Sequence, residues 1–171
     1  MKSNFLIIID GTIGAGKSTT ANLLHKKLNG TALISLDKIK HFISGVKIDD
    51  FEKIRLASEI GSIITKEYLK RRINVIVEKS FTQERYVKDF LKMINKKGIN
   101  ILIYQIDAPF ETRKLRVKQR TALKGGTKIS LSKLKRNTLH FQNLRYKKAK
   151  IFDSNKMGPM QIVNKLLQDL K

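Results

Sequence analysis

The sequence lacks cysteine and tryptophan, has only two prolines, and is poor in acidic residues. Without cysteine there can be no disulfide framework and no cysteine-ligated zinc or iron–sulfur site, and the three histidines are scattered along the chain. The longest apolar run, Phe5 to Ile9, is too short for a membrane span or the core of a signal peptide. We therefore expect a cytoplasmic protein that does not interact with a membrane.

The shortage of acidic residues is concentrated in one segment of the chain. The 36 Lys and Arg residues outnumber the 14 Asp and Glu residues, which gives a formal net charge of +22. Residues 112–150 contain 14 Lys or Arg and no acidic residue. Such a segment could bind nucleic acid, although a general bias toward lysine would also place many cations on the surface.

Long polar linkers and internal repeats are also absent, so we expect residues 1–171 to form one domain. Five short apolar runs have the character of buried strands. They alternate with stretches of helical periodicity, which predicts an α/β fold with a parallel sheet and helices on both faces. The expected strands cover 5–9, 31–35, 74–77, 100–106 and 150–152, and the expected helices cover 17–28, 50–70, 82–95, 109–123, 130–147 and the region from about 159.

The strongest motif follows the first expected strand and opens the first expected helix. It reads Gly11-Thr-Ile-Gly14-Ala15-Gly16-Lys17-Ser18-Thr19, a complete G-x-x-x-x-G-K-[ST] phosphate-binding loop, or P-loop. The glycines let backbone N–H groups surround a polyphosphate at a helix N-terminus. Lys17 would reach the β- and γ-phosphates of ATP, and Ser18 would bind Mg²⁺. The loop residues Thr12 and Ile13 have no predicted role.

Two carboxylates follow neighbouring strands on the side where a parallel sheet binds its ligands. Asp37 comes after the second expected strand and Glu78 after the third. A carboxylate at either place could accept a proton from an attacking hydroxyl or hold Mg²⁺ through water. Two structural roles are also open, because Asp37 could cap a helix and Glu78 could pair with a lysine.

Together these features resemble the small P-loop kinases of the adenylate-kinase-like fold. The similarity is to the group of zeta-toxin-like, chloramphenicol-phosphotransferase-like and polynucleotide-5'-kinase-like proteins, and it spans nearly the whole chain. It is carried by the P-loop, Asp37, the stretch Val75–Arg85, the stretch Asp107–Arg120 with its R-x-x-x-R pair, and Ile151–Asn155.

The resemblance implies a three-layer αβα sandwich with strand order 2-3-1-4-5 and a helical lid at about 121–136. It also implies that Asp37 is the base that activates the acceptor hydroxyl and that Glu78 joins Ser18 at the metal. Three further groups are expected at the nucleotide: Arg116 and Arg120 as catalytic lid arginines, Arg113 near the adenine, and Ser154 and Asn155 in the adenine loop.

Two positions depart from the pattern of this group. Lys40 stands where some members carry an arginine, and Glu78 stands where an aspartate is usual. Glu78-Lys79-Ser80 is also similar to the Glu-Arg-Ser motif of deoxynucleoside kinases. Arg85 could face either the acceptor or the solvent.

We therefore predict an enzyme, a Mg²⁺-dependent kinase that moves the γ-phosphate of ATP to an acceptor hydroxyl or phosphate. The acceptor could be a small molecule, a nucleoside, a nucleotide or a polynucleotide 5' end. The alternative is a protein that binds nucleic acid through residues 112–150 and uses ATP as a switch or ligand without phosphorylating an acceptor.

Overall fold

The computed structural model describes residues 4–42, 48–81, 84–94, 97–123, 128–142 and 149–170. Within these ranges, the chain forms a sheet of five strands and seven helices that flank it. The strands are β1 (Asn4–Gly11), β2 (Thr31–Ser35), β3 (Asn74–Glu78), β4 (Ile99–Asp107) and β5 (Lys150–Asp153). The helices are α1 (Lys17–Lys27), α2 (Leu36–Lys40), α3 (Asp50–Lys70), α4 (Glu84–Lys92), α5 (Phe110–Ala122), α6 (Leu131–Gln142) and α7 (Pro159–Gln168).

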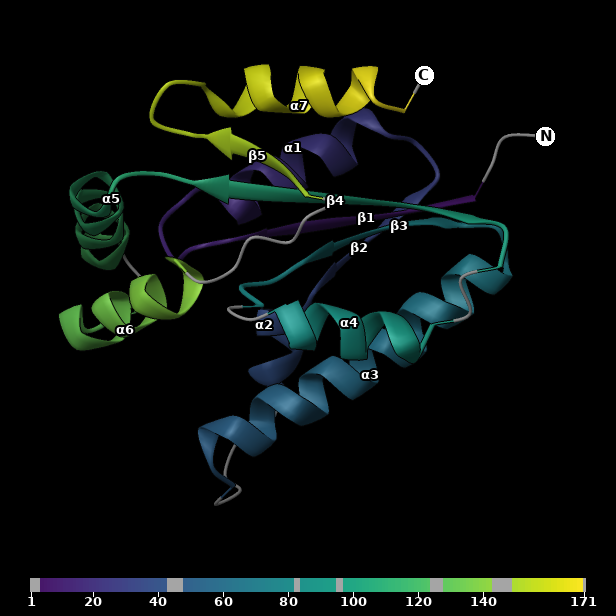
Figure 1. Cartoon of the computed structure of the whole chain (residues 1–171), viewed down its shortest axis with the longest axis horizontal. Helices are drawn as coiled ribbons and strands as arrows, with labels where there is room; N and C mark the ends of the chain where they lie inside the picture. Colours follow the sequence, from purple (N-terminus) through teal and green to yellow (C-terminus); the bar gives the residue numbers. More distant parts are fainter. Residues whose placement is uncertain are drawn as a thin grey trace.

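All neighbouring strands are parallel, and their order is β2-β3-β1-β4-β5 (Figure 1). In the centre of the sheet, Ile8 of β1 lies between Val77 of β3 and Ile103 of β4. The central strands are apolar without alternation because helices cover both of their faces. The predicted α/β class, the parallel sheet and the strand order are confirmed.

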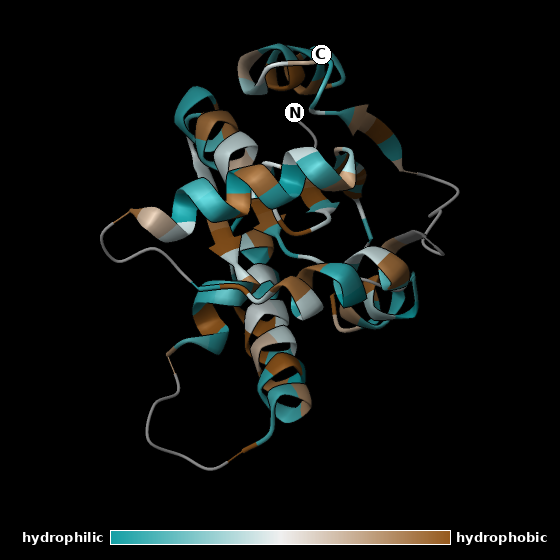
Figure 2. Cartoon of the chain, turned by 90° about the vertical axis from the view of Figure 1, so that its left-hand side faces the viewer, coloured by the Kyte–Doolittle hydropathy of each residue, from teal (hydrophilic) through white to brown (hydrophobic). Residues whose placement is uncertain are grey.

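Two apolar cores join the helices to the sheet. On one face, Ile7 and Ile9 of β1 pack with α1 and α7, which contributes Ile162 and Leu166. On the other face, Leu6 and Ile8 pack with residues of α2, α3 and α4. Figure 1 shows the sheet edge-on between these two layers, with α5 and α6 beyond the end toward which the strands point. Figure 2, viewed from that end, shows hydrophobic and hydrophilic segments alternating along the helices.

Two predicted helices differ in extent from the observed ones, and one observed helix was not predicted. Helix α4 spans Glu84–Lys92 within the expected 82–95. Helix α6 spans Leu131–Gln142, and residues 143–147 of the expected 130–147 lie outside the described residues. The unpredicted helix is α2, which buries Leu36 and Ile39. Its five residues are too few for helical periodicity to be recognised.

No helix in the described ranges is long and apolar enough to span a membrane. The single domain over 1–171 stays a prediction, as does the lid at 121–136. Residues 124–127 of that lid lie outside the described ranges, and the remainder comprises the end of α5 and the beginning of α6.

Candidate functional site

The P-loop between β1 and α1 passes so close to neighbouring backbone that its first glycines have no room for a side chain. A Cβ at Gly11, where φ is +150°, would lie 1.9 Å from the Ile106 carbonyl oxygen. A Cβ at Gly14, where φ is +84°, would lie 2.8 Å from the Arg113 carbonyl oxygen. Around Gly16, where φ is +95°, no heavy atom lies within 4 Å of the Cβ position. Glycine therefore lets the loop pack against β4 and α5, and leaves space in front of α1.

The N-terminus of α1 is open toward that space. Gly16 caps the helix and provides no side-chain hydrogen bond to it, so the first-turn N–H groups are available to an anion. Lys17 is 6% exposed and its Nζ donates to the Thr12 carbonyl oxygen at 3.1 Å, across the loop. The Ala15 N–H is engaged within the loop, since it donates to the same oxygen at 3.2 Å. Thr19 is exposed in the first turn of α1.

Ser18 and Glu78 are brought into direct contact. Ser18 Oγ donates to Glu78 Oε1 at 2.8 Å, and Ser35 Oγ donates to Glu78 Oε2 at 2.9 Å. A hydroxyl and a carboxylate are hard oxygen donors of the type that Mg²⁺ prefers. The described residues contain no cluster of three or more His, Asp or Glu side chains suited to a metal. The pair therefore fits a Mg²⁺ ion that keeps water and phosphate oxygens as its other ligands.

Asp37 lies in the first turn of α2, where it is exposed. The N-cap of that helix is Ser35, so Asp37 does not have the capping role that was the structural alternative. In the described ranges no hydrogen bond or ion pair engages its carboxylate. Strands β2 and β3 are parallel neighbours, and Ser35 lies opposite Glu78. Asp37 and Glu78 therefore lie at the same edge of the sheet, the one formed by the carboxyl ends of the strands.

Lys40, at the end of α2, forms an ion pair with Asp50 at 3.1 Å. Burial of Lys40 is substantial, since its side chain is 15% exposed. Arg85 is exposed on α4 and lies over the ring of Tyr86, with 4.8 Å between the guanidinium carbon and the ring centroid. Neither cation contacts Asp37 or Glu78.

Arg116, Ser154 and Asn155 gather where α5 meets the loop after β5. Arg116 donates to both Ser154 Oγ and the Ser154 carbonyl oxygen at 2.9 Å. Asn155 accepts a hydrogen bond from Thr112 Oγ1 at 3.0 Å. Arg120 is exposed one turn further along α5, on the way to α6. The structure thus brings three of the predicted nucleotide contacts together and leaves Arg120 facing solvent.

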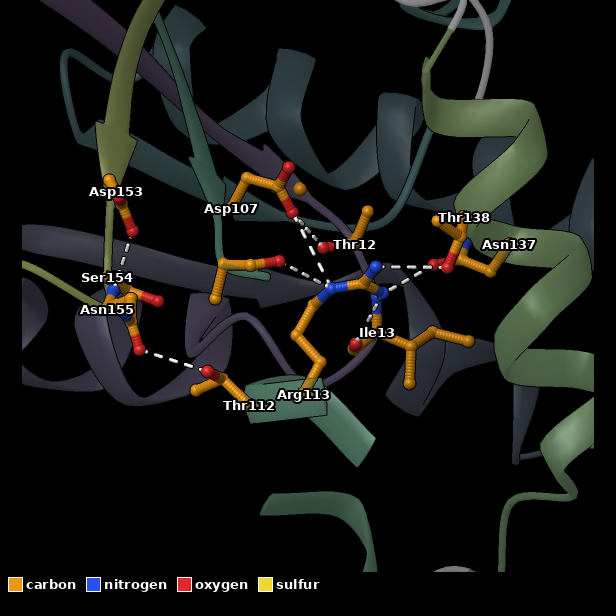
Figure 3. Close-up of polar contacts among 12 residues, drawn as sticks. Thr12, Ile13, Asp107, Thr112, Arg113, Asn137, Thr138, Asp153, Ser154 and Asn155 are labelled. Atoms are coloured by element: carbon orange, nitrogen blue, oxygen red, sulfur yellow. Dashed lines mark hydrogen bonds and ion pairs between the residues drawn. The ribbon is translucent and has the colours of Figure 1, made fainter. Parts of the chain in front are cut away.

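Arg113 has a different environment from the other two arginines. It is 2% exposed, and burial lowers the pKa of its guanidinium. Its Nε donates to the Ala108 carbonyl oxygen at 2.8 Å, and one terminal nitrogen donates to Thr138 Oγ1 at 3.0 Å. The other terminal nitrogen donates to the Ile13 carbonyl oxygen at 3.5 Å. These bonds join α5 to the P-loop and to α6 (Figure 3).

Thr12 and Ile13, the two loop residues without a predicted role, belong to the same network (Figure 3). Thr12 Oγ1 donates to Asp107 Oδ1 at 2.5 Å, and the Ile13 N–H donates to Asn137 Oδ1 at 2.8 Å. Asn137 is 7% exposed and comes from α6. The P-loop is therefore held from outside by β4, α5 and α6 together.

A second contact that the sequence did not reveal links the P-loop to the segment after β3. Asp10 is fully buried and accepts hydrogen bonds from the Gly11 N–H at 2.7 Å and the Phe81 N–H at 2.9 Å. Burial raises the pKa of its carboxyl group. Ser80 Oγ donates to the Gly11 carbonyl oxygen at 2.7 Å. These bonds fix residues 79–81 beside the P-loop.

We expect Arg113→Ala to destabilise the fold by about 3 kcal/mol, because it leaves a cavity at a buried position and leaves the carbonyl oxygens of Ala108 and Ile13 without their donor. Urea unfolding measures the loss. Lys114→Ala is the matched control on the next residue, which is exposed, and should change the free energy of unfolding by less than about 0.5 kcal/mol. Equal effects of the two substitutions would contradict a joining role for Arg113.

Helix α6 belongs to the segment 112–150, which is rich in lysine and arginine, and it has both buried and exposed side chains. Leu134 and Phe141 are buried at 2% and 8% exposure, so these side chains belong to the core. Lys133, Lys135 and Arg136 of the same helix are exposed. Cations are therefore presented to solvent at the same end of the sheet as the P-loop (Figure 1).

Solved structures that share this fold belong to several kinds of protein. A chain of the Pnkp1/Rnl/Hen1 RNA repair complex aligns with a TM-score of 0.70 and 20% identity over 83% of this chain, which spans 45% of that longer chain. A putative kinase from Chloroflexus aurantiacus aligns with a TM-score of 0.71 and 19% identity, over 99% of this chain and 97% of that one. A gluconokinase from Sinorhizobium meliloti 1021 aligns with a TM-score of 0.67 and 18% identity, over 99% and 93%.

At these identities the similarity shows the fold alone. No curated protein matches the sequence. A family model described as an AAA domain matches residues 6–144, which include the P-loop, both strand-end acids and the arginines of α5. The chain therefore belongs to this AAA domain family.

Proposed function

We propose that this protein is an ATP-dependent phosphotransferase that moves the γ-phosphoryl group of ATP to a hydroxyl of a nucleoside, a nucleotide or a polynucleotide 5' end. One observation carries the proposal: the two acids at the edge of the sheet have different surroundings. Glu78 is bonded to Ser18 of the P-loop, whereas Asp37 is exposed and unengaged within the described ranges. One carboxylate thus lies on the nucleotide side and the other is available to an acceptor.

The nucleotide would lie along α1 and α5. The N–H groups of Gly14 and of Gly16 to Thr19 would bind the phosphates, and Lys17 would exchange its bond to the Thr12 carbonyl oxygen for phosphate oxygens. Ser154 and Asn155 would contact the adenosine end, and Arg116, which is bonded to Ser154, would be a lid arginine that exchanges this bond for phosphate oxygens. Ser18 and Glu78 would hold Mg²⁺, which neutralises charge on the β- and γ-phosphates when bound.

The acceptor hydroxyl would donate its proton to Asp37 as its oxygen attacks the γ-phosphorus, and the bond from that phosphorus to the bridging oxygen would break, so that ADP leaves. Phosphoryl transfer depends mainly on positioning and on neutralising charge on the equatorial oxygens. The exposed Arg120 can supply that charge if it turns from solvent toward the phosphate. The N–H groups of Arg113 donate to oxygen atoms of the protein itself. Arg113 would therefore hold the P-loop in position rather than contact the nucleotide.

Incubation with Mg²⁺, γ-labelled ATP and a panel of acceptors tests the proposal. The panel should include nucleosides, nucleoside monophosphates, 5'-hydroxyl DNA and RNA, and sugars, because the solved structures of this fold include a gluconokinase and a chain of an RNA repair complex. We expect label in one acceptor class. The proposal is overturned if every acceptor stays unlabelled under conditions in which calorimetry shows ATP bound.

The exposed cations of α6 favour a second candidate function, a nucleic-acid-binding protein that transfers no phosphate. Such a protein would bind RNA or DNA with a steep dependence on salt. Replacing Lys133, Lys135 and Arg136 with glutamine should then weaken binding uniformly across sequences and reduce the salt slope by about one for each phosphate that is no longer neutralised. Fluorescence anisotropy at several salt concentrations measures this. Binding that survives the triple substitution with an unchanged slope would exclude α6 as the contact surface.

A further inference from the structure

Glu78 and Lys79 are consecutive residues, and their side chains point to opposite faces of the sheet. The carboxylate of Glu78 lies toward α1, where it meets Ser18. The ammonium group of Lys79 lies toward the other face, 5.4 Å from the centroid of the Phe81 ring, which belongs to the core beneath α2, α3 and α4. The end of β3 therefore presents a carboxylate to the nucleotide side and a cation to the side of Asp37.

The backbone fixes the position of Lys79. Its N–H donates to the Ile9 carbonyl oxygen at 3.2 Å, and the next residue, Ser80, is bonded to Gly11. The side chain is only 6% exposed, and this burial lowers the pKa of its ammonium group. Asp37 and Asp10 partly offset that effect, whereas Lys40 adds to it. The cation thus lies within electrostatic range of both the proposed base and the strand that carries the P-loop.

Three lysines at this end of the sheet, the buried Lys17 and Lys79 and the partly buried Lys40, differ in their partners. Lys17 donates to a carbonyl oxygen, and Lys40 is paired with Asp50. Lys79 has neither kind of partner in the described part of the chain, where its close contact is the face of Phe81. The nearby Asp10 already accepts hydrogen bonds from two backbone N–H groups.

A buried ammonium group without an oxygen partner is costly, because it has lost water and gained only an aromatic face. An anion that entered from the side of Asp37 would satisfy it. The acceptor is the ligand that must approach Asp37, so its own charged group is the natural counterion.

We propose that Lys79 binds an anionic group, a phosphate or a carboxylate, that the acceptor carries in addition to the hydroxyl that is phosphorylated. This inference rests on the proposed function, and it narrows the acceptor to anionic molecules. Phosphate and carboxylate share the chemistry that recognises an ammonium group, so matched acceptors must distinguish them.

The test compares acceptors that differ only in an anionic group: a nucleoside with its 3'-monophosphate, both with a free 5'-hydroxyl, and glucose with gluconate. For the preferred pair, wild-type kcat/KM should favour the anionic member by at least about tenfold. Lys79→Met keeps the buried length of the side chain and should remove that preference by raising KM for the anionic member alone. Lys79→Arg should restore most of it, and Lys66→Met, on the exposed surface of α3, should change nothing.

The results separate this inference from the function on which it rests. If no acceptor is phosphorylated, the proposed function fails. If acceptors are phosphorylated but Lys79→Met lowers kcat equally for both members of each pair, Lys79 acts on the transferred phosphate or on folding, and the inference fails.

An independent binding readout uses inorganic phosphate as the probe while Mg²⁺ and a non-hydrolysable ATP analogue fill the P-loop. By NMR titration we expect saturable phosphate binding to wild type and to Lys79→Arg, and at least about tenfold weaker binding to Lys79→Met. Equal binding by wild type and Lys79→Met would overturn the inference.

Discussion

Lys17→Met is expected to lower kcat/KM for ATP by at least about 10³-fold, since it removes the charge that would hold the β- and γ-phosphates through transfer. The folded state should change little, because methionine fills the space of the buried lysine stem and only one hydrogen bond, to the Thr12 carbonyl oxygen, is removed. Steady-state kinetics measure the first effect and thermal unfolding the second.

The matched control for this substitution is Lys26→Met, in the last turn of the same helix, where the side chain is exposed. It should leave kcat/KM unchanged. Full activity of Lys17→Met together with normal stability would show that the loop does not bind the phosphates of the substrate in the proposed way.

Asp37→Asn is expected to lower kcat by about 10²- to 10⁴-fold, the range for loss of a general base, with little change in the KM for ATP. The amide keeps the shape of the side chain but cannot accept the hydroxyl proton. Asp37 is exposed and unengaged within the described ranges, so stability should not change. Initial rates at saturating acceptor measure the effect, with Asp89→Asn on the exposed surface of α4 as the control.

The same experiment distinguishes the two acids. Glu78→Gln should raise the Mg²⁺ concentration needed for half-maximal activity, because a neutral amide replaces the carboxylate that would hold Mg²⁺ with Ser18. If Glu78→Gln abolished transfer at saturating Mg²⁺ while Asp37→Asn remained active, the roles assigned to the two carboxylates would be reversed.

Local patterns were sufficient to predict the strands, their parallel arrangement and the P-loop, whereas the strand order came from the resemblance to small P-loop kinases. The strands are short apolar runs that need no alternation because both faces are covered, and the P-loop motif is read from consecutive residues. Strand ends in a parallel sheet lie together, so the placement of Asp37 and Glu78 at one edge also followed from the sequence.

The contacts that hold the P-loop in place could not be predicted in this way. Asn137 bonds to Ile13 across 124 positions of sequence, and Arg113 bonds to Thr138 from another helix. Neither residue type indicates such a partner, because asparagine and arginine are both common on exposed helix surfaces. Arg113 shares the spacing of Arg116 and Arg120, yet it is buried while Arg120 is exposed. Only packing distinguishes arginines that follow the same helical period.

The burial of Lys79 also could not be predicted from the residues beside it in the sequence. In the sequence, Lys79 stands between Glu78 and Ser80, where a surface ion pair is the ordinary expectation. The fold separates Lys79 from Glu78 by the alternation of the strand and buries it against Phe81. The charge excess of the chain therefore includes at least one cation that is held at the site rather than dispersed over the surface.

The central claim is that the γ-phosphoryl group passes to an acceptor rather than to water. The most direct measurement is the fate of labelled γ-phosphate in a single reaction that contains Mg²⁺, ATP and the preferred acceptor, with both products quantified. We predict that each ATP consumed yields one phosphorylated acceptor, and that omitting the acceptor nearly stops ATP consumption. Release of the label as inorganic phosphate at the same rate with and without every acceptor tested would contradict the account.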